Sequence, residues 1–305
     1  MEQSRKKAKK KIWPWVVGIL GLLAVGIGIY VFMVFNSLSN TLEEMHEPID
    51  REVSEKRTEE VVFEDKDPFS VLLLGVDERE GDQGRSDTMV VMTVNPTEKS
   101  TKMVSIPRDT YTEIVGHGTT DKINHAYAFG GIEMSLATAE NLLDIPIDYV
   151  VQVNMEGFQD IVDAVGGVDV NNSLAFDDFA TGNIHLTGEQ ALAFVRMRYE
   201  DPRGDFGRQD RQKQVLQGIM REGASVNSLV NFKDIFGALG DNVRTNMTFD
   251  EMVDVQANYR DAVGTVDQII VKEGYGETIN GIWYYMMDDA ELTEIQSTLK
   301  NHLGV

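Results

Sequence analysis

The sequence predicts a single α/β domain, residues 68–305, in which helices cover a mixed sheet, preceded by one membrane-spanning segment. Three observations support this prediction. Short apolar runs typical of buried strands alternate with helical stripes of apolar residues from residue 69 onward. No repeat, low-complexity tract or linker divides that region. One uncharged stretch near the amino terminus is long enough to cross a bilayer.

The amino-terminal residues predict a membrane anchor. Residues 12–35 form 24 residues without a charge, which span about 36 Å as a helix. The basic tail, residues 1–11, precedes them, so the positive-inside rule keeps this tail in the cytoplasm and exports the rest as a single-pass type II protein of the cell membrane. A cleaved signal peptide is the alternative. Residues 36–67 are rich in acidic residues and are expected to be a solvated stalk.

Composition restricts the partners of the exported part. The 305 residues carry a formal net charge of -22, and 42% of them are hydrophobic. Because so acidic a protein is repelled by nucleic acid, no nucleic-acid partner is expected. Cysteine is absent, which excludes disulfides and thiol chemistry. An anionic ligand must therefore be bound locally, by a few basic side chains.

The first strands of the domain are read from three apolar runs in quick succession. They are expected at Phe69–Leu74, Thr88–Val94 and Met103–Ile106, with turns between them. Connections this short favour a sheet that is at least partly antiparallel.

Helices and further strands are predicted along the rest of the chain. Thr187 and Gln190 form a capping-box pattern that begins a helix ending near Phe194. The other expected helices are Ile132–Leu143 after Gly130 and Gly131, one marked by Phe158, Ile161, Val162 and Val165, a stripe from Leu229 to Leu239, one from Thr248 to Tyr259, and a closing helix at Leu292, Ile295 and Leu299. The other expected strands are Tyr149–Val153, Val168–Val170 and Gln268–Val271.

Six basic side chains are concentrated between residues 196 and 213 of this acidic chain. Arg196 and Arg198 alternate with apolar residues, which places both guanidiniums on one face if the segment is extended. Arg208 and Gln212 lie one helical turn apart on an apolar stripe. Since arginine binds phosphate oxygens in a bidentate manner, this pattern favours a polyanion pocket. The alternative is a solvated basic face whose arginines pair with the nearby acidic residues Glu200, Asp201, Asp205 and Asp210.

Two aspartates mark neighbouring strand ends. Asp77 closes the first predicted strand, Asp87 precedes the second, and Arg85 lies between them. If the strands are neighbours, the carboxylates converge, and with phosphate oxygens they suit Mg²⁺. The alternative is that both are ordinary turn residues.

A second basic group follows the third strand. Arg108 comes directly after Pro107, which ends strand pairing, and Lys122 follows in the segment KINHAY. Ion pairing of Arg108 with Asp109 is the simpler interpretation of that pair. His125 is expected to be a structural, hydrogen-bonded residue, because the histidines show no metal-ligand spacing. The sequence also lacks a P-loop, a GxSxG elbow and an HExxH motif.

At these residues the sequence resembles the LytR-CpsA-Psr family of Gram-positive cell-wall enzymes. The similarity covers roughly residues 69–225 in order. Its segments are LLLGVDEREGDQGRSDTMVVMTVNP from Leu72, VSIPRDTY from Val104, KINHAYAFGG from Lys122, VDAVGGVDV from Val162, LTGEQALAFVRMRY from Leu186 and GDFGRQDRQKQVL from Gly204.

The resemblance implies an extracellular phosphotransferase. Its donor would be a polyprenyl-pyrophosphate-linked anionic glycopolymer, such as wall teichoic acid, and its acceptor a sugar hydroxyl of peptidoglycan. Asp77 and Asp87 match metal ligands for Mg²⁺ or Mn²⁺. The positions that match pyrophosphate or head-group contacts of the family are Arg85, Arg108, Lys122, Arg196, Arg198, Arg208 and Gln212. Of all the matched residues, those expected to act in catalysis are Arg85, Arg108, Arg196, Arg198 and Asp87.

Several functional questions stay open at the level of sequence. The base that removes the acceptor proton is not identified, and Asp87, Asp109 and Asp205 are candidates. With water as acceptor, the same site gives a polyprenyl-pyrophosphate hydrolase. A membrane-tethered attenuator of transcription is the alternative from a different class, although direct DNA contact by so acidic a domain is disfavoured.

Overall fold

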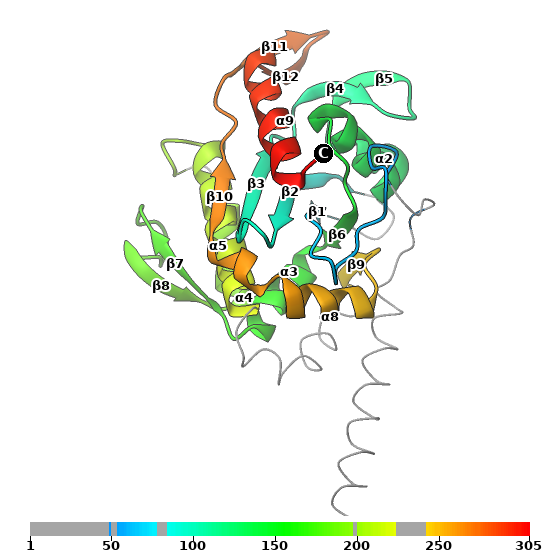
Figure 1. Cartoon of the computed structure of the whole chain (residues 1–305). Helices are drawn as coiled ribbons and strands as arrows, with labels where there is room; N and C mark the ends of the chain where they lie inside the picture. Colours follow the sequence, from blue (N-terminus) through cyan, green and yellow to red (C-terminus); the bar gives the residue numbers. More distant parts are fainter. Residues whose placement is uncertain (1–48, 50–53, 78–83, 198–199, 224–241) are drawn as a thin grey trace, which may run out of the picture.

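A central six-stranded sheet organises the protein (Figure 1). The computed structural model describes residues 49, 54–77, 84–197, 200–223 and 242–305. The strand order is β10-β3-β2-β1-β6-β9. The strands are β1 (Phe69–Val76), β2 (Ser86–Asn95), β3 (Ser100–Ile106), β6 (Tyr149–Val153), β9 (Val243–Thr245) and β10 (Val266–Ile269).

The sheet is mixed, as the sequence predicts. β1, β2 and β3 form an antiparallel meander, while β6 runs parallel to β1 and β10 runs parallel to β3. β9 closes the other edge antiparallel to β6. The strands that were predicted from apolar runs are present, and β1 and β2 extend beyond the runs by one or two residues at their ends. β10 begins and ends earlier in the chain than the predicted run Gln268–Val271.

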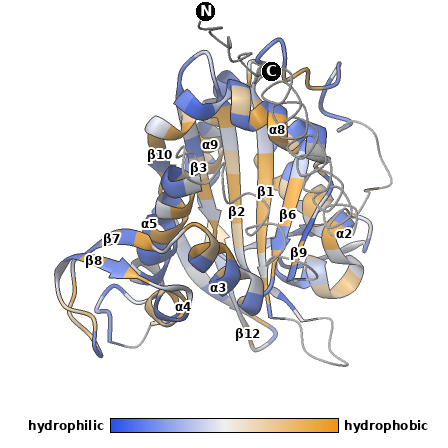
Figure 2. Cartoon of the chain, turned by 90° about the horizontal axis from the view of Figure 1, so that it is seen from below, coloured by the Kyte–Doolittle hydropathy of each residue, from blue (hydrophilic) through white to orange (hydrophobic). Residues whose placement is uncertain are grey.

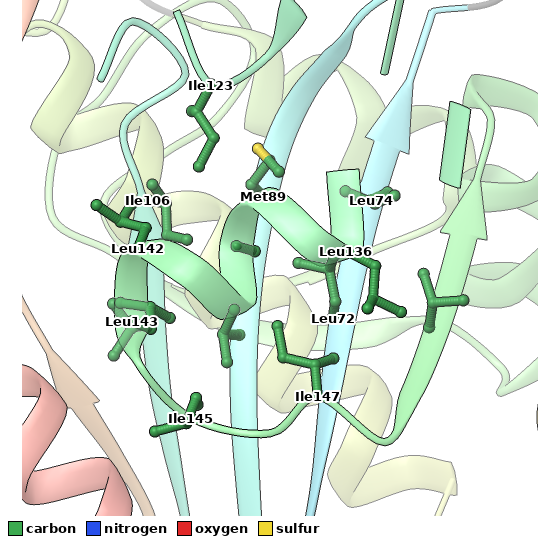
Figure 3. Close-up of a cluster of buried hydrophobic side chains, with 14 of the residues drawn as sticks. Leu72, Leu74, Met89, Ile106, Ile123, Leu136, Leu142, Leu143, Ile145 and Ile147 are labelled. Carbon is green, nitrogen blue, oxygen red and sulfur yellow. The ribbon is translucent and has the colours of Figure 1, made fainter. Parts of the chain in front are cut away.

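One face of the sheet is covered by α2 (His125–Leu143) and α9 (Asp289–Leu303). Side chains such as Leu72 and Leu74 of β1 and Met89 of β2 point to this face because alternate residues of a strand share a side. Figure 3 shows them turned toward Leu136 and other residues of α2. This cluster is the main hydrophobic core of the described residues.

Two glycines divide α2. Gly130 and Gly131 have non-helical backbone angles, and Gly131 has φ 62° and ψ -145°, a conformation that L-residues with a side chain avoid. The predicted helix Ile132–Leu143 is therefore confirmed as the second half of α2. The first half, from His125 to Phe129, is not anticipated by the apolar pattern.

A second layer lies on the opposite face of the sheet. It contains α3 (Met155–Ala164), α4 (Gly188–Arg196), α5 (Asp205–Gly223) and the hairpin of β7 (Val168–Asn172) and β8 (Gly182–Leu186). In Figure 2, α3 lies in front of the sheet, with the hairpin and α4 beside α5. A separate apolar cluster that includes Val162, Phe194 and Val215 holds these elements together. The Thr187 capping box is present at the start of α4, as predicted.

Aromatic packing joins the segment before β1 to the sheet. Phe63 is 5% exposed and packs against Phe69, Tyr149 and Tyr259, at ring-centroid distances of 5.3, 5.7 and 5.6 Å. Tyr259 follows α8 (Phe249–Asn258), which leads into the short 3₁₀ helix η2 (Arg260–Gly264). The described end of the predicted stalk, residues 54–67, thus packs on the domain.

Polar contacts fix the same segment further. Arg57 donates to both carboxylate oxygens of Asp148 and to the carbonyl of Pro68. Lys56 pairs with Asp144 at 2.5 Å, and Ser54 donates to the buried carboxylate of Glu140 at 2.6 Å.

The last helix closes the far end of the sheet. Ile295, Leu299 and Leu303 of α9 lie in the main core. His302 is 1% exposed and its ring nitrogens lie 2.7 Å from Thr93 Oγ1 and 3.0 Å from Ser100 Oγ. Burial, together with the charge of Lys102, lowers the pKa of His302, so the ring is neutral in a hydrogen-bonded site.

Two small hairpins lie at the other end of the sheet, at the top of Figure 1. They are β4 (Tyr111–Ile114) with β5 (Thr119–Lys122), and β11 (Gly274–Ile279) with β12 (Ile282–Met287). A bridge between Thr110 and Tyr285 joins them. The sequence patterns do not predict these hairpins.

The predicted membrane span, residues 12–35, and the predicted helix around residues 229–239 lie outside the described residues. Within the described ranges, none of the helices has the length and apolar character needed to traverse a bilayer.

Candidate active site

A β-bulge places the two predicted aspartates at adjacent strand ends. The pairing of β1 with β2 shifts between Gly75, which is opposite Thr88, and Val76, which is opposite Ser86. Asp87 is the extra residue, and a bulge of this kind redirects the local side chains. The Asp77 amide donates to the Arg85 carbonyl at 3.4 Å, which continues the ladder by one residue. The condition set for the two aspartates, that their strands are neighbours, is therefore met.

Arg108 reaches this bulge from the end of β3. Because β3 runs antiparallel to β2, its carboxyl end lies beside the start of β2. Arg108 Nη1 donates to Asp87 Oδ1 at 2.8 Å, and Arg108 Nε lies 3.7 Å from Asp109 Oδ2. Arg108 thus interacts with the neighbouring Asp109, as the simpler interpretation expects, and also with Asp87, 21 residues earlier in the chain.

The helix α5 brings two more predicted residues to the same place. Arg208 and Gln212 lie one turn apart on α5, so they share a helix face. Gln212 Nε2 donates to Thr88 Oγ1 of β2 at 3.2 Å. This bond ties the helix to the strand directly beside the bulge.

These side chains line one pocket between the sheet and α5. Its volume is about 240 Å³, including the part open to solvent. Four residues predicted as site residues, Asp87, Arg108, Arg208 and Gln212, lie in its wall. The remaining lining residues are Thr88, Met89, Val90, Ser105, Ile106, Pro107 and Gln209. The structure therefore gathers residues from three distant parts of the chain into one polar recess.

Lys122 lies next to this pocket but not in its wall. Its Nζ is 2.6 Å from Asp109 Oδ1 and 5.9 Å from the centre of the Tyr284 ring. A chain of alternating charges, from Asp87 through Arg108 and Asp109 to Lys122, thus leads from the pocket to β5. Arg85 is exposed at the start of β2.

The expectation that Arg196 lies on an extended segment is wrong. The helix that begins at the Thr187 capping box continues past Phe194, where the pattern predicts its end. Arg196 is therefore the last residue of α4, and it is exposed. The structure does not bring Arg196 to the pocket wall. Arg198 lies outside the described residues.

Two arginines of the basic cluster form ion pairs, as the alternative interpretation of that cluster expects. Arg211 is 3% exposed, and its Nη1 donates to Asp201 Oδ2 at 2.6 Å. Arg203 pairs with Asp210 at 2.5 Å. Of the basic cluster, Arg203 and Arg211 thus form ion pairs and Arg208 lines the pocket.

Asp201 and Arg211 are structural residues whose pairing the sequence does not single out. Arg211 also donates to the carbonyls of Phe194 and Met197 near the end of α4. Burial opposes ionisation of Asp201, but the hydrogen bonds from Arg211 and Arg203 hold its pKa below the ordinary value. Gly207 offers a signal in retrospect, because a Cβ there would lie 1.7 Å from Asp201 Oδ2.

Asp77 and Asp87 fit a Mg²⁺ ion only as a partial set of ligands. Among the described residues there is no group of three or more side chains able to hold a metal. Mg²⁺ in phosphate-handling sites is often bound by one or two carboxylates, with water and substrate oxygens completing the shell. The donor set at the bulge is consistent with that arrangement.

Comparisons with known proteins agree on one family. Residues 31–301 match the model of the LytR_cpsA_psr family. A protein of Bacillus cereus named polyisoprenyl-teichoic acid–peptidoglycan teichoic acid transferase TagU is 55% identical over 301 residues, 97% of this chain and 99% of its own length.

Two solved structures show the same fold. TagT bound to LI-WTA superposes with a TM-score of 0.73 at 36% identity, over 85% of this chain and 100% of that chain. An Enterococcus faecalis protein described as a transcriptional regulator gives a TM-score of 0.74 at 43% identity, over 81% of this chain and 91% of that chain.

Proposed function

Because the chain belongs to the LytR-CpsA-Psr family, we propose that it is an enzyme that transfers teichoic acid from a polyisoprenyl carrier to peptidoglycan. Its curated relatives carry that activity in their name. The observation in the structure that supports it best is the pocket in which Arg108, Arg208 and Gln212 meet Asp87. In a chain with a net charge of -22, such a local recess is where an anionic donor can bind.

The pocket suits the diphosphate of the donor. Arg108 and Arg208 offer guanidinium donors that match phosphate oxygens, and Gln212 adds a neutral amide. We also assign Arg85, Arg196 and Arg198 to the donor, on the family resemblance alone, because Arg85 and Arg196 are exposed outside the pocket wall and Arg198 lies outside the described residues. Lys122 holds Asp109 beside Arg108.

A divalent cation belongs to the same proposal. Asp77 and Asp87 would hold Mg²⁺ or Mn²⁺, which when bound offsets negative charge on the phosphate oxygens. The β-bulge supports this assignment, because it puts both carboxylates at one end of the sheet.

The reaction is a substitution at phosphorus. The acceptor hydroxyl oxygen forms a bond to the phosphorus nearer the glycopolymer, while the bond from that phosphorus to the bridging oxygen breaks. Polyisoprenyl phosphate leaves, and the hydroxyl proton passes to water or to a carboxylate of the pocket. The arginines stabilise charge that develops on the leaving oxygen, and this electrostatic effect dominates phosphoryl-transfer catalysis.

The proposed function places the protein in the cell envelope. We place residues 12–35 in the membrane, with the basic tail inside and residues 68–305 outside the cell. The uncharged stretch and the preceding lysines support this topology.

The function is tested with the full-length chain, a polyisoprenyl-pyrophosphate-linked teichoic acid and a peptidoglycan acceptor. Asp87→Asn removes the charge that pairs with Arg108, and we expect it to lower the rate of transfer by about 100-fold or more. Asp261→Asn is the matched control, since Asp261 is an ion-paired but exposed residue outside the pocket. Equal transfer by both variants would contradict the assignment of the site.

Adding or omitting the acceptor separates transfer from hydrolysis. A transferase turns over the donor faster with peptidoglycan present and forms the polymer-linked product. Turnover that ignores the acceptor and yields free glycopolymer phosphate would instead identify the protein as a polyisoprenyl-pyrophosphate hydrolase.

A role in transcription is the second candidate, because the Enterococcus faecalis neighbour carries that description. The acidity of the chain argues against direct DNA contact. Promoter binding by the full-length protein at physiological salt would reverse this ranking.

A further inference from the structure

Three aromatic rings lie together near the start of α2. The rings of His117 and Phe129 are stacked, with centroids 4.1 Å apart and planes at 11°. The ring of His125 meets Phe129 edge-on at 5.9 Å. His117 is exposed and Phe129 is 43% exposed, although phenylalanine is usually buried, while the His125 side chain is 21% exposed. We call His117, His125 and Phe129 the aromatic strip.

The kink in α2 presents the strip. His125 and Phe129 lie at positions i and i+4 of the first half of α2, so their side chains share a face. The helix is interrupted directly afterward at Gly130 and Gly131. Phe129, the last residue before this break, is exposed, whereas Ala126 and Tyr127 of the same half are buried.

Each imidazole is held by its own partner. His117 Nδ1 lies 2.8 Å from Thr119 Oγ1, and His125 Nδ1 lies 2.8 Å from Asp121 Oδ2. Asp121 also accepts from the Lys122 amide at 2.8 Å and from the Tyr284 hydroxyl at 3.2 Å. Burial opposes ionisation of Asp121, but these bonds hold its pKa below the ordinary value. The ring positions are therefore fixed before any ligand binds.

The strip adjoins the loop that carries Arg108. The Asn124 amide donates to the Arg108 carbonyl at 3.3 Å, and the Ile123 amide donates to the Thr110 carbonyl at 2.9 Å. His125 is the next residue in the chain, so the strip begins within a few ångströms of the backbone of a pocket residue.

We propose that the aromatic strip binds sugar rings of the peptidoglycan acceptor, a proposal that rests on the transferase function above. The acceptor is a polymer, so the sugars that adjoin its reacting end lie on surface next to the pocket. Flat apolar rings with fixed polar groups at their edges suit the C–H faces and the hydroxyl and amide groups of neutral amino sugars. Lys122, the nearby cation, is paired with Asp109, and Asp121 beside His125 is acidic, which favours a neutral ligand over the anionic donor polymer.

A second set of exposed apolar residues lies on the β11–β12 hairpin. Tyr275 is 60% and Trp283 49% exposed. The two side chains point to opposite faces of the hairpin, because Tyr275 is paired with Met286 and Thr278 with Trp283. The Trp283 indole lies against Gly276 of its own hairpin. These two rings do not form a common platform, so the strip is the better candidate.

The test measures acceptor dependence in the full-length protein. Phe129→Ala is expected to raise the KM for a peptidoglycan glycan-strand oligomer by about tenfold. Because the diphosphate site is unchanged, the KM for the donor and kcat at saturating acceptor should stay within about twofold. Phe129→Trp keeps a flat ring and is expected to restore the acceptor KM. Tyr275→Ala, which removes an equally exposed ring elsewhere, is the matched control and should leave all constants unchanged.

Direct binding of the same oligomer to the protein without donor gives an independent result. Affinity should fall about tenfold in Phe129→Ala and not in Tyr275→Ala. An unchanged acceptor KM and affinity in Phe129→Ala, or a loss confined to Tyr275→Ala, would overturn the proposal. A wild-type protein that transfers nothing would instead contradict the proposed function, so the two failures are distinct.

Discussion

The guanidinium of Arg211 joins the end of α4 to the start of α5. It donates to the carbonyls of Phe194 and Met197 and to the carboxylate of Asp201. All of these contacts are buried or nearly so. Since Arg208 lies less than one turn before Arg211 on the same helix, this network also sets the position of a pocket residue.

Removing this charge is expected to destabilise the fold. Arg211→Met leaves Asp201 buried without its main partner, and loss of one member of a buried pair costs about 3–5 kcal/mol of unfolding free energy. Arg203→Met, at a residue whose side chain is 47% exposed, should cost less than about 1 kcal/mol. Urea unfolding followed by circular dichroism compares the two. Adding Asp201→Asn to Arg211→Met should recover part of the loss, and a change below about 1 kcal/mol in Arg211→Met itself would refute this account.

The sequence identified residues that line the pocket, but it did not distinguish arginines of the pocket from arginines in structural ion pairs. Asp87, Arg108, Arg208 and Gln212 lie in the wall of one pocket, because strand ends and a helix face are readable from the pattern. The other described residues expected at the site, Asp77, Arg85, Lys122 and Arg196, do not lie in that wall. The pattern could not distinguish Arg208 in the pocket from Arg211 in a buried pair, since both are arginines on one helix. That distinction depends on the packing of α5 against α4, which local sequence does not encode.

At the scale of elements, α2 consists of two halves that meet at a glycine pair. The break between them depends on Gly131, whose backbone conformation excludes a Cβ without strain. The glycine pair is visible in the sequence, yet the helix that precedes it is not, because residues 125–129 are too few to show a helical apolar period, although Ala126 and Tyr127 are buried.

Gly131→Ala should be costly although nothing lies within 4 Å of the position that the added methyl group would take. The expected loss is about 1–3 kcal/mol from backbone strain alone. Gly264→Ala, where space is equally open and φ is not positive, should change stability by less than about 0.5 kcal/mol. Thermal unfolding of both variants measures the difference, and equal melting temperatures would show that the kink is not strained.

Elements with long apolar runs were predictable, and exposed hairpins were not. β1, β2 and β6 are buried in the sheet, so their composition alone identifies them. The β4–β5 hairpin and β11 carry mostly polar residues, so no apolar pattern marks them. β12 has the apolar sequence IWYYMM, yet it was not assigned as a strand from the sequence. It pairs with its neighbour β11, and the bridge between Thr110 and Tyr285 that joins the two hairpins becomes known only once the fold is assembled.

At the scale of the whole molecule, the segment 54–67 is part of the packed domain. Phe63 completes a cluster of four aromatic rings, and Arg57 spans Asp148 and Pro68. The acidic composition of this segment predicts a solvated spacer. One phenylalanine among many charged residues does not change that prediction.

A protein that begins at residue 68 should therefore be less stable than one that begins at residue 54. Burial of Phe63 alone is worth about 3–5 kcal/mol by comparison with other Phe→Ala changes. For a domain of this size we expect Tm to fall by at least about 6 °C. Phe63→Ala in the longer protein should reproduce most of the fall. Identical thermal unfolding of the two lengths would show that the segment does not contribute.

The position of His302 has a consequence for biosynthesis. Its ring bonds Thr93 and Ser100, and the helix around it fills the core built by the first strands. The ribosome must therefore synthesise residues near position 300 before the core beside the first strands can close. Products of premature termination keep that core open, and proteases can recognise and remove them.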